Sequence, residues 1–265
     1  MNRTVIVSGA SSGIGYAIAT ALHNNGYQVV GVSRSFPKQP YLFKYVLADI
    51  TKEADIIALS NHLSDEYSHI YALINCAGMG ISGAVEHTQI EEVKKMFDVN
   101  VFGMFLMTKA IVPLLRGVKH AKIINISSVA GDLSIPFQTF YSMTKASVNA
   151  FSSALALELK PFDISVCSVL PGDTQTNFTQ NREKPTVLTD ELYQDRIKRS
   201  IERMEKDEAN GKNPKTVAKV VSRLLKRKRM PAKVTVGFLY KLFVFLNRIL
   251  PNRLVQSILY KMYAK

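Results

Sequence analysis

Cysteine and tryptophan are scarce in this sequence, which has two cysteines and no tryptophan in 265 residues. Cys76 and Cys167 each lie in or beside a strand-like apolar run, where a small buried thiol is the usual interpretation. Two scattered thiols without a nearby histidine cluster supply neither a disulfide framework nor a set of metal ligands. We therefore expect no structural disulfide and no metal site.

Long hydrophobic runs are missing near both ends of the chain. The apolar run at residues 5–7, close to the start of the chain, is too short for the apolar region of a secretory signal. Near the other end, Phe238 to Leu250 and Arg253 to Tyr263 form two amphipathic helical stretches separated by Pro251. Neither stretch reaches the roughly 20 uninterrupted apolar residues that span a bilayer. We expect a cytoplasmic protein.

Acidic residues are absent from both ends of the chain. The first is Asp49, and none occurs from Ala209 to Lys265, where 14 lysines and arginines lie. The last part of the chain therefore carries the formal net charge of +13, and the body before it is close to neutral. Such asymmetry is typical of a protein that meets an anionic surface, and equally of basic helices that are only solvated on a hydrophobic body. No aromatic stacking platform accompanies the charge, so a nucleic-acid partner is not expected.

Apolar runs alternate with helical apolar spacing through the first 170 residues. This alternation predicts an α/β fold, a doubly wound parallel sheet (Rossmann fold) of about seven strands with helices on both faces. Strands are expected near residues 4–8, 27–32, 43–47, 70–74, 121–127, 163–169 and 233–236, and helices over 13–24, 52–67, 90–116, 141–160 and 190–210.

These elements predict one catalytic domain over residues 1–237, with a basic amphipathic helical extension of the same domain over 238–265. Two prolines between Arg34 and Tyr41 leave at most a helical stub in that connection. The polar segment at 174–214 directly follows a strand end, and a long segment in that place is commonly a lid over a site. We expect it to cover the substrate.

A glycine-rich turn follows the first expected strand. Gly9, Gly13 and Gly15 are spaced Gly-x-x-x-Gly-x-Gly before a helix rich in alanine and isoleucine. Glycines allow the backbone to turn sharply and approach a pyrophosphate, whose charge the helix N-terminus stabilises. A tight turn that serves only packing is the alternative for this motif taken alone.

Tyr141 and Lys145 are four positions apart at the start of an expected helix, so they lie on one face about one turn apart. A lysine ammonium at that distance stabilises a phenolate, which makes the tyrosine a usable general acid and base. Taken alone, such a pair is more often an ordinary surface pair.

The motifs occur together in one order. The glycine-rich turn is followed by Asn75-Cys76-Ala77-Gly78, Asn100, the Ile-Ser-Ser-x-x-Gly stretch with Ser127, Ser128 and Gly131, the Tyr141/Lys145 pair, and Pro171-Gly172 with Thr176. The sequence thereby resembles the short-chain dehydrogenase/reductase family over residues 4 to about 236, with Cys76 in place of a commoner Asn.

The resemblance implies that Asn100, Ser128, Tyr141 and Lys145 are the catalytic residues. Tyr141 is then the proton donor and acceptor, and Ser128, rather than Ser127, hydrogen-bonds the substrate oxygen. Asn100 corresponds to the residue that anchors a water in a proton relay to Lys145. The resemblance also implies a homodimer formed through the helices at 90–116 and 141–160.

The cofactor can be inferred from the second expected strand. A site that prefers NAD needs a carboxylate there, about 20 residues beyond the glycines, and none is present before Asp49. Ser33 and Arg34 occupy that strand end instead, with Lys38 nearby, and an arginine fork suits the extra phosphate of NADP. A solvated loop charge is the alternative for Arg34.

The resemblance adds Asp49 beside the adenine, Ile126 as a lining residue, and Thr174 and Thr176 at the nicotinamide carboxamide. From the motifs and the resemblance taken together, we expect NADP(H) to be bound by residues of these turns and strand ends: Gly9, Ser11, Ser12, Gly13, Ile14, Gly15, Ser33, Arg34, Asp49, Ile50, Asn75, Ala77, Gly78, Tyr141, Lys145, Pro171, Gly172, Thr174 and Thr176.

The expected activity is NADPH-dependent reduction of a carbonyl on a hydrophobic substrate, reversible in principle. Candidate pocket walls are apolar, though each could equally belong to the core: Met79, Ile81, Leu133, Ile135, Phe137, Phe178 and Tyr193. Similar family members act on steroids, retinoids and long-chain keto lipids. A nucleotide sensor or a scaffold with little turnover is the alternative, and the basic tail leaves peripheral membrane contact or packing on the body as open interpretations.

Overall fold

A computed structural model describes residues 3–176 and 193–264 of the chain. Within them a seven-stranded parallel sheet has the order β3-β2-β1-β4-β5-β6-β7. Each strand lies within two residues of its expected position, so the predicted fold class is confirmed. The strands are β1 (Thr4–Ser8), β2 (Gln28–Ser33), β3 (Lys44–Leu47), β4 (Ala72–Asn75), β5 (Ala121–Ile126), β6 (Ile164–Pro171) and β7 (Lys233–Val236).

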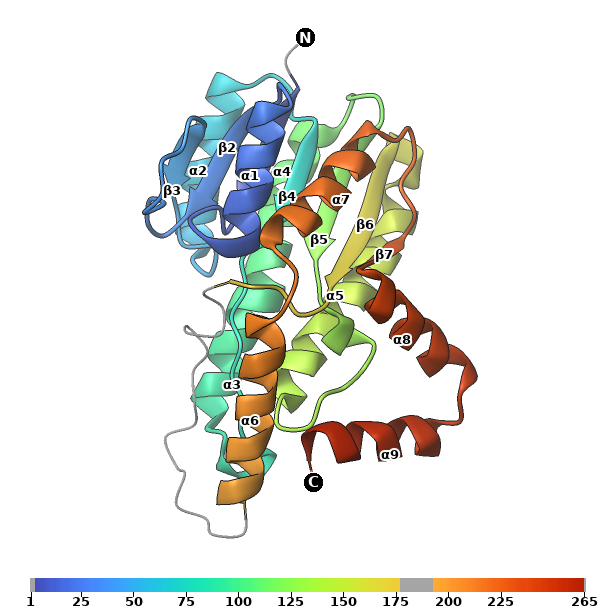
Figure 1. Ribbon diagram of the computed structural model, residues 1–265. Helices are drawn as coiled ribbons and strands as arrows, with labels where there is room; N and C mark the ends of the chain where they lie inside the picture. The colour runs from blue at the N-terminus through green and yellow to red at the C-terminus, as the bar shows by residue number, and fades with distance from the viewer. Residues whose placement is uncertain (1–2, 177–192, 265) are drawn as a thin grey trace.

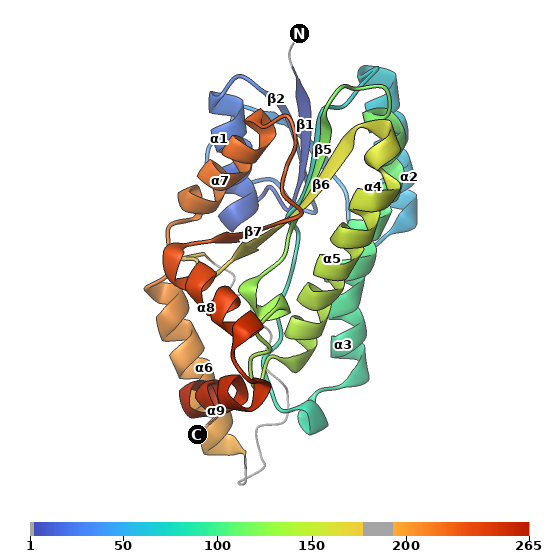
Figure 2. The same ribbon diagram turned by 90° about the vertical axis from the view of Figure 1, so that its right-hand side faces the viewer.

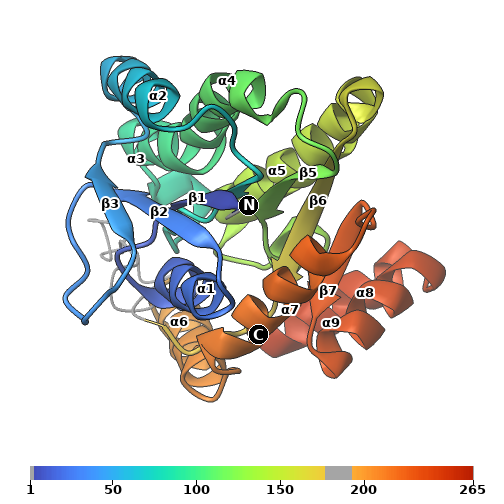
Figure 3. The ribbon, with the colours of Figure 1, turned by 90° about the horizontal axis from the view of Figure 1, so that it is seen from above.

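Helices cover both faces of the sheet (Figures 1 and 3). Helices α1 and α7 lie on one face, and α2, α4 and α5 lie on the other. Their bounds are α1 (Gly13–Asn24), α2 (Glu53–Glu66), α3 (Ile90–Phe97), α4 (Gly103–Leu115), α5 (Thr139–Glu158), α6 (Gln194–Ala209), α7 (Pro214–Lys226), α8 (Phe238–Ile249) and α9 (Asn252–Tyr263).

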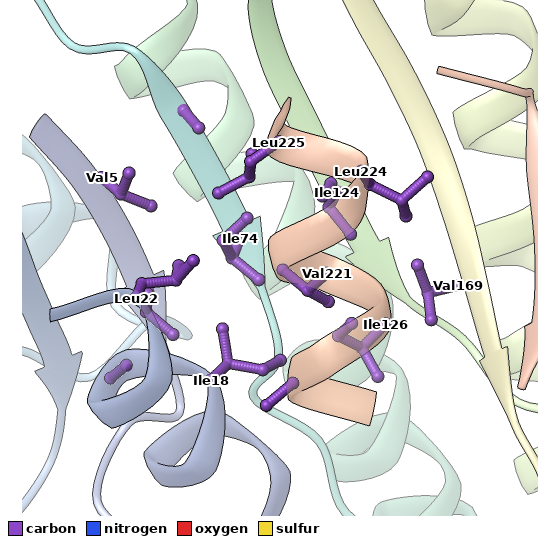
Figure 4. Packing of buried hydrophobic residues seen from close by; sticks show 14 of the residues in the cluster. Val5, Ile18, Leu22, Ile74, Ile124, Ile126, Val169, Val221, Leu224 and Leu225 are labelled. Atoms are coloured by element: carbon purple, nitrogen blue, oxygen red, sulfur yellow. The ribbon is translucent and has the colours of Figure 1, made fainter. Parts of the chain in front are cut away.

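Successive side chains of each strand point to opposite faces of the sheet, so one strand contributes to the core on both faces. In β1, Val5 and Val7 belong to the cluster under α1 and α7, while Ile6 between them belongs to the cluster under α2, α4 and α5. Figure 4 shows the first cluster, with Leu225 and Val221 of α7 directed at the strands. Because both faces are buried, the strands read as nearly continuous apolar runs.

The structure differs from the expectation in two helices. Helix α7 was not expected, although Asn213 accepts a hydrogen bond from the Lys215 backbone as its N-cap and Pro214 occupies its first turn. The helix expected over 90–116 is three elements, because the π-helical turn η2 (Asp98–Phe102) separates α3 from α4.

The stretch Ile90–Leu115 is long and apolar enough to cross a membrane by length and composition, with a mean hydropathy of 1.4. In the fold, 44% of its most apolar window is buried, and Met107 and Ile111 of α4 lie in the core cluster under α2. This packing is typical of the core helix of a globular domain.

The segment expected to form a lid is described at both ends. The backbone of Lys212 donates to Asp173 and accepts from Gln175, and α6 lies within the helix expected over 190–210. The rest of that segment, with the candidate wall Phe178, lies outside the described residues. After β7 the chain forms α8, which runs along the edge of the molecule, and α9, which turns back beneath the body toward α6 (Figures 1 and 2).

Candidate active site

The glycine-rich turn joins β1 to α1 where the strand order reverses between β1 and β4. A Cβ on Gly9 would lie 2.7 Å from the Ala77 backbone, and one on Gly15 would lie 2.1 Å from the Gly9 carbonyl oxygen. Gly9 also has a φ of 69°. The turn therefore requires glycine at these positions, and it presses against the segment that follows β4.

The N-terminus of α1 suits a phosphate group. Its N-cap, Ser12, makes no side-chain capping bond, and the first turn of this helix contains no acidic residue. Its backbone N–H groups and dipole therefore have no competing carboxylate in that turn. Together with the close backbone approach at Gly9, this arrangement fits the pyrophosphate of a dinucleotide.

The end of β2 brings Arg34 close to Asp49. The carboxylate of Asp49 accepts hydrogen bonds from the Thr51 backbone at 3.0 Å and its hydroxyl at 2.8 Å. Burial alone would raise the pKa of Asp49, but these bonds and the charges of Arg34 and Lys52 hold it below its usual range. A surface hollow of about 430 Å³ adjoins the pair and is lined by Arg34, Asp49, Thr51, Glu91, Lys94, Lys95, Asp98 and Val99.

Tyr45 is a residue of this region that the sequence did not single out. Its hydroxyl hydrogen-bonds Ser33 at the end of β2 and also interacts with the side chain of Ser11 in the glycine-rich turn. Burial raises the pKa of Tyr45. The one available signal was its position on the strand beside β2, because neighbouring parallel strands end at the same edge.

Tyr141 and Lys145 meet as expected near the start of α5. The Lys145 Nζ atom lies 5.6 Å from the centre of the Tyr141 ring. The same ammonium donates to the Ile126 carbonyl oxygen at 3.2 Å, at the end of β5. Lys145 is buried and Tyr141 is partly exposed, so the phenol is accessible while its cation is fixed.

Burial lowers the pKa of Lys145 to about 8. Cys76 lies close enough to interact electrostatically with Lys145, and burial raises the pKa of that thiol to about 12. The cysteine is therefore a neutral neighbour of the lysine near neutral pH. Its proximity to Lys145 was not expected, because the two residues are far apart in the sequence.

The two adjacent serines have different partners. The Ser127 hydroxyl donates to the Lys145 carbonyl oxygen at 3.0 Å, which ties β5 to α5. Ser128 is partly exposed, and its hydroxyl oxygen accepts from the Ala130 backbone at 3.1 Å, so its proton remains able to meet a substrate oxygen. This placement agrees with the choice of Ser128 over Ser127.

Asn100 lies in the π-helical turn η2 and is buried. Its side chain exchanges two hydrogen bonds with the Met79 backbone, at 2.8 and 2.9 Å, and donates to Thr144 at 3.0 Å. It thus joins the segment after β4 to α5, one residue before Lys145. A Cβ on Gly78 would lie 3.3 Å from Asn100 Oδ1 and 3.5 Å from Lys145 Nζ, so glycine leaves space beside the pair.

The expected nicotinamide-binding residues follow β6. The Thr174 hydroxyl donates to the Gly172 carbonyl oxygen at 2.8 Å. A Cβ on Gly13 would lie 3.4 Å from Thr176 Cβ, so Thr176 lies against the glycine-rich turn. Directly before Thr174, the Asp173 carboxylate accepts from the Tyr240 hydroxyl of α8 at 2.5 Å. That link to the C-terminal helices was not expected.

Some expected cofactor residues have side chains in the core. Asn75 donates to Thr108 at 3.1 Å and to Asn125 at 2.9 Å, and thereby joins β4 to α4 and β5. Ile50 is buried against Gly103 of α4, and Ile14 packs on the cluster under α1. These side chains support the turn and the strand ends from within the core.

The candidate pocket walls fall into two groups. Ile135, Phe137 and Tyr193 pack with α6, where the rings of Phe137 and Tyr193 are edge to face at 6.4 Å. Leu133 packs with Val129, Leu170 and Val244 of α8. Ile81 is buried and Met79 is partly buried. Leu133, Ile135 and Phe137 thus place apolar side chains on the segment between Ser128 and Tyr141.

Comparison with known proteins agrees with this geometry. Residues 3–186 match the short chain dehydrogenase family. A 3-ketodihydrosphingosine reductase from Bacteroides thetaiotaomicron is 38% identical over 264 residues, which cover 99% of this chain and 98% of that protein. A Helicobacter pylori protein described as a probable short-chain type dehydrogenase/reductase is 33% identical over 257 residues, 96% of this chain and 95% of that protein. The crystal structure of a short-chain dehydrogenase from Streptomyces avermitilis has a TM-score of 0.80 at 26% identity, covering 98% of this chain and 96% of that one.

Proposed function

The chain belongs to the short-chain dehydrogenase/reductase family, and we propose that it reduces the ketone of a long-chain keto lipid with NADPH. Membership makes it an oxidoreductase that uses a nicotinamide dinucleotide and acts on CH–OH groups or their carbonyl counterparts. The observation that carries the finer proposal is the near full-length similarity to a 3-ketodihydrosphingosine reductase, at 38% identity. The apolar side chains on the segment between Ser128 and Tyr141, which pack with α6 and α8, support a hydrophobic substrate.

When bound, NADPH supplies a hydride for the carbonyl carbon. Tyr141 donates its phenolic proton to the carbonyl oxygen, so the ketone becomes an alcohol and the tyrosine is left as a phenolate. Ser128 hydrogen-bonds the same oxygen and fixes its direction relative to Tyr141. The Lys145 ammonium stabilises the phenolate, and Asn100 holds the Met79 segment and α5 in register around that lysine.

The preference for NADPH rests on the end of β2. Arg34 is exposed at the mouth of the hollow that it shares with Asp49 and Thr51. A guanidinium there can pair with the adenosine phosphate of NADP through charge-assisted hydrogen bonds. Ser33 and Tyr45, which hydrogen-bond each other beside it, add hydroxyl donors at the same strand end.

We also propose a homodimer in the cytoplasm. Large apolar side chains remain exposed on the outer faces of η2, α4 and α5, among them Phe102, Phe105, Met143 and Leu157. A second copy that packed these faces together would bury them. Both cysteines are free, which fits a reducing compartment.

The test is a panel of ketones followed by NADPH absorbance: 3-ketodihydrosphingosine in detergent micelles, a steroid ketone, retinal and a small hydrophilic ketone. We expect turnover to be fastest with the long-chain keto lipid. Equal or greater turnover with the hydrophilic ketone would contradict the proposed substrate class. Tight NADPH binding with no turnover on any member would support a nucleotide sensor instead.

A further inference from the structure

Helix α8 exposes a continuous apolar stripe. Phe238 is 86% exposed, Phe245 58% and Ile249 60%, with Leu242 also exposed between them. These four residues are spaced by three or four positions, so they share one face of the helix. Leu239 extends the stripe at its start, where it too is exposed.

The opposite face of α8 already anchors the helix to the body. Val244 is buried against Val129 and Leu170, and Asn247 donates to the Asp132 carbonyl oxygen at 3.0 Å. Tyr240 lies directly on Gly172, where a Cβ would come within 2.3 Å of its ring. The residues of this face are also three or four positions apart, about half a turn from the exposed stripe. Among the residues that the structure describes, the stripe therefore plays no part in packing α8 onto the domain.

Helix α9 repeats this arrangement with fewer contacts. Val255, Leu259 and Tyr263, four residues apart, are its partly buried positions, and the Arg196 side chain donates to the Ala264 carbonyl oxygen at 3.1 Å. Leu254, Ile258 and Met262 form a second row at the same spacing and are exposed. Within the described residues, α9 is thus held to α6 at its C-terminal end and leaves an apolar row uncovered.

The charges on these two helices are of one sign. Lys241, Arg248, Arg253 and Lys261 are exposed, and α8 and α9 contain no acidic residue. Three acidic groups of the body near these helices already have partners. Asp132 pairs with Lys233 at 2.8 Å, Asp207 pairs with Arg203 at 2.9 Å, and Asp173 accepts from Tyr240. The basic run at 226–229 precedes β7 at the other end of the sheet and does not contribute.

We propose that the exposed faces of α8 and α9 form a docking surface for an anionic lipid bilayer. Helices that lie in the plane of a membrane interface expose phenylalanine, leucine and isoleucine beside lysine and arginine, as these two helices do. A symmetric contact with a second copy would place the same basic side chains against each other. Anionic headgroups instead complement all four charges.

The surface lies at the substrate end of the molecule. Figures 1 and 2 show α8 and α9 below the carboxyl edge of the sheet, on the side of α6 and the start of α5. The end of α9 packs in one cluster with Phe137 and Tyr193, and α8 contacts Gly172 and Asp173. If the proposed function holds, a bilayer seated there presents its lipid next to the apolar segment between Ser128 and Tyr141.

Vesicle co-sedimentation of the full chain tests the surface without any turnover assay. Intact protein is mixed with phosphatidylcholine vesicles, with or without phosphatidylglycerol, at low and high salt. We expect sedimentation with the anionic vesicles and at least tenfold weaker binding at high salt. The variant F238S/F245S/I249S should lose binding at least tenfold, and K241E/R248E/R253E should lose the preference for anionic vesicles.

Matched controls carry the same substitutions on other faces. L42S/I57S/F162S changes three residues that are 82%, 55% and 44% exposed, and K119E/K160E/K228E changes three exposed lysines away from α8 and α9. Both controls should bind vesicles like the intact protein, and all four variants should keep NADPH affinity and the circular dichroism of a folded chain.

Binding that is unchanged in F238S/F245S/I249S, or absent from the intact protein at low salt, would overturn the proposal. The proposal would also be overturned if the intact protein did not bind vesicles and F238S/F245S/I249S had a lower oligomer mass than the intact protein. A second copy of the chain would then cover the stripe. Failure of the keto-lipid assay alone would leave the membrane result unaffected.

Discussion

At the scale of single residues, the account depends on Tyr141 as the proton donor. Replacing it with phenylalanine removes the hydroxyl and keeps the ring beside Lys145. We expect Tyr141→Phe to lower kcat by about 10²- to 10⁴-fold, the usual contribution of a positioned acid. NADPH affinity, measured by fluorescence titration, should stay within about twofold because other elements hold the dinucleotide. A variant that turns over at the parent rate would remove Tyr141 from the mechanism.

Lys145 predicts how activity depends on pH. Its pKa in the folded protein is lowered to about 8 by burial, below the unfolded value of about 10.4. Reduction should therefore slow as pH rises through about 8, because the ammonium that supports Tyr141 loses its proton. The same group acts on stability with the opposite sign. The unfolded chain binds more protons between the two pKa values, so this lysine's contribution to the free energy of unfolding rises with pH across that window. A pH profile of kcat/KM that stays level to pH 10 would contradict the assignment.

Arg34 predicts the choice of cofactor. Wild type should favour NADPH over NADH by at least about tenfold in kcat/KM, equivalent to about 1.4 kcal/mol. Arg34→Ala should reduce that ratio mainly by weakening NADPH binding, since NADH lacks the phosphate that the guanidinium would meet. The exposed Lys119→Ala, at the far end of the sheet, serves as the control. An unchanged ratio in Arg34→Ala would assign the selectivity to other residues, with Tyr45 and Ser33 the next to examine.

At the scale of elements, α7 is the helix on which one face of the core depends. Leu225 is fully buried in the cluster with the strands (Figure 4). We expect Leu225→Ala to lower the free energy of unfolding by about 2–5 kcal/mol, as for other buried leucines. Urea unfolding followed by circular dichroism measures the change. The control Leu157→Ala, on the exposed side of α5, should change it by less than about 0.5 kcal/mol in the monomer. A loss below about 1 kcal/mol at Leu225 would mean that α7 adds little to this core.

Elements with a strong local pattern were predictable. The buried strands are apolar runs, and α1, with Gly13 at its start, was predicted with its observed bounds. Helix α7 was missed although the sequence carries its signal: Val217, Val221 and Leu224 recur at helical spacing after the Asn213-Pro214 start. The π-helical turn at Asn100 was missed because a change in backbone hydrogen bonding leaves no change in apolar spacing.

The site was predictable where its residues fall in one motif. Tyr141 and Lys145 are four apart on one helix, so their contact follows from helical geometry. Contacts between distant segments were not predictable in that way. Cys76 beside Lys145, Tyr45 beside Ser33, and Asp173 bonded to Tyr240 each depend on the order of strands and on which loops meet at the sheet edge.

At the scale of the whole molecule, function is concentrated at one end. The order of strands reverses between β1 and β4, and the glycine-rich turn and the Ala77 segment meet there. Ligands of open parallel sheets bind beyond such a switch point. The proposed catalytic groups after β5 and on α5 lie at that same end, as do the segment after β6 and helices α6, α8 and α9 (Figure 1). Four basic side chains of the chain's last part, on α8 and α9, therefore lie at the end that holds the site, although the motifs of the site lie in the nearly neutral body.

The most direct test of the central claim follows the hydride itself. The enzyme is incubated with 3-ketodihydrosphingosine and NADPH deuterated at the transferable position, and the lipid product is analysed by mass spectrometry. The account predicts an alcohol that carries deuterium on the former carbonyl carbon, formed by wild type and nearly absent with Tyr141→Phe. If the wild type binds NADPH but leaves the keto lipid unreduced, or forms an alcohol without deuterium, the proposed reaction is contradicted.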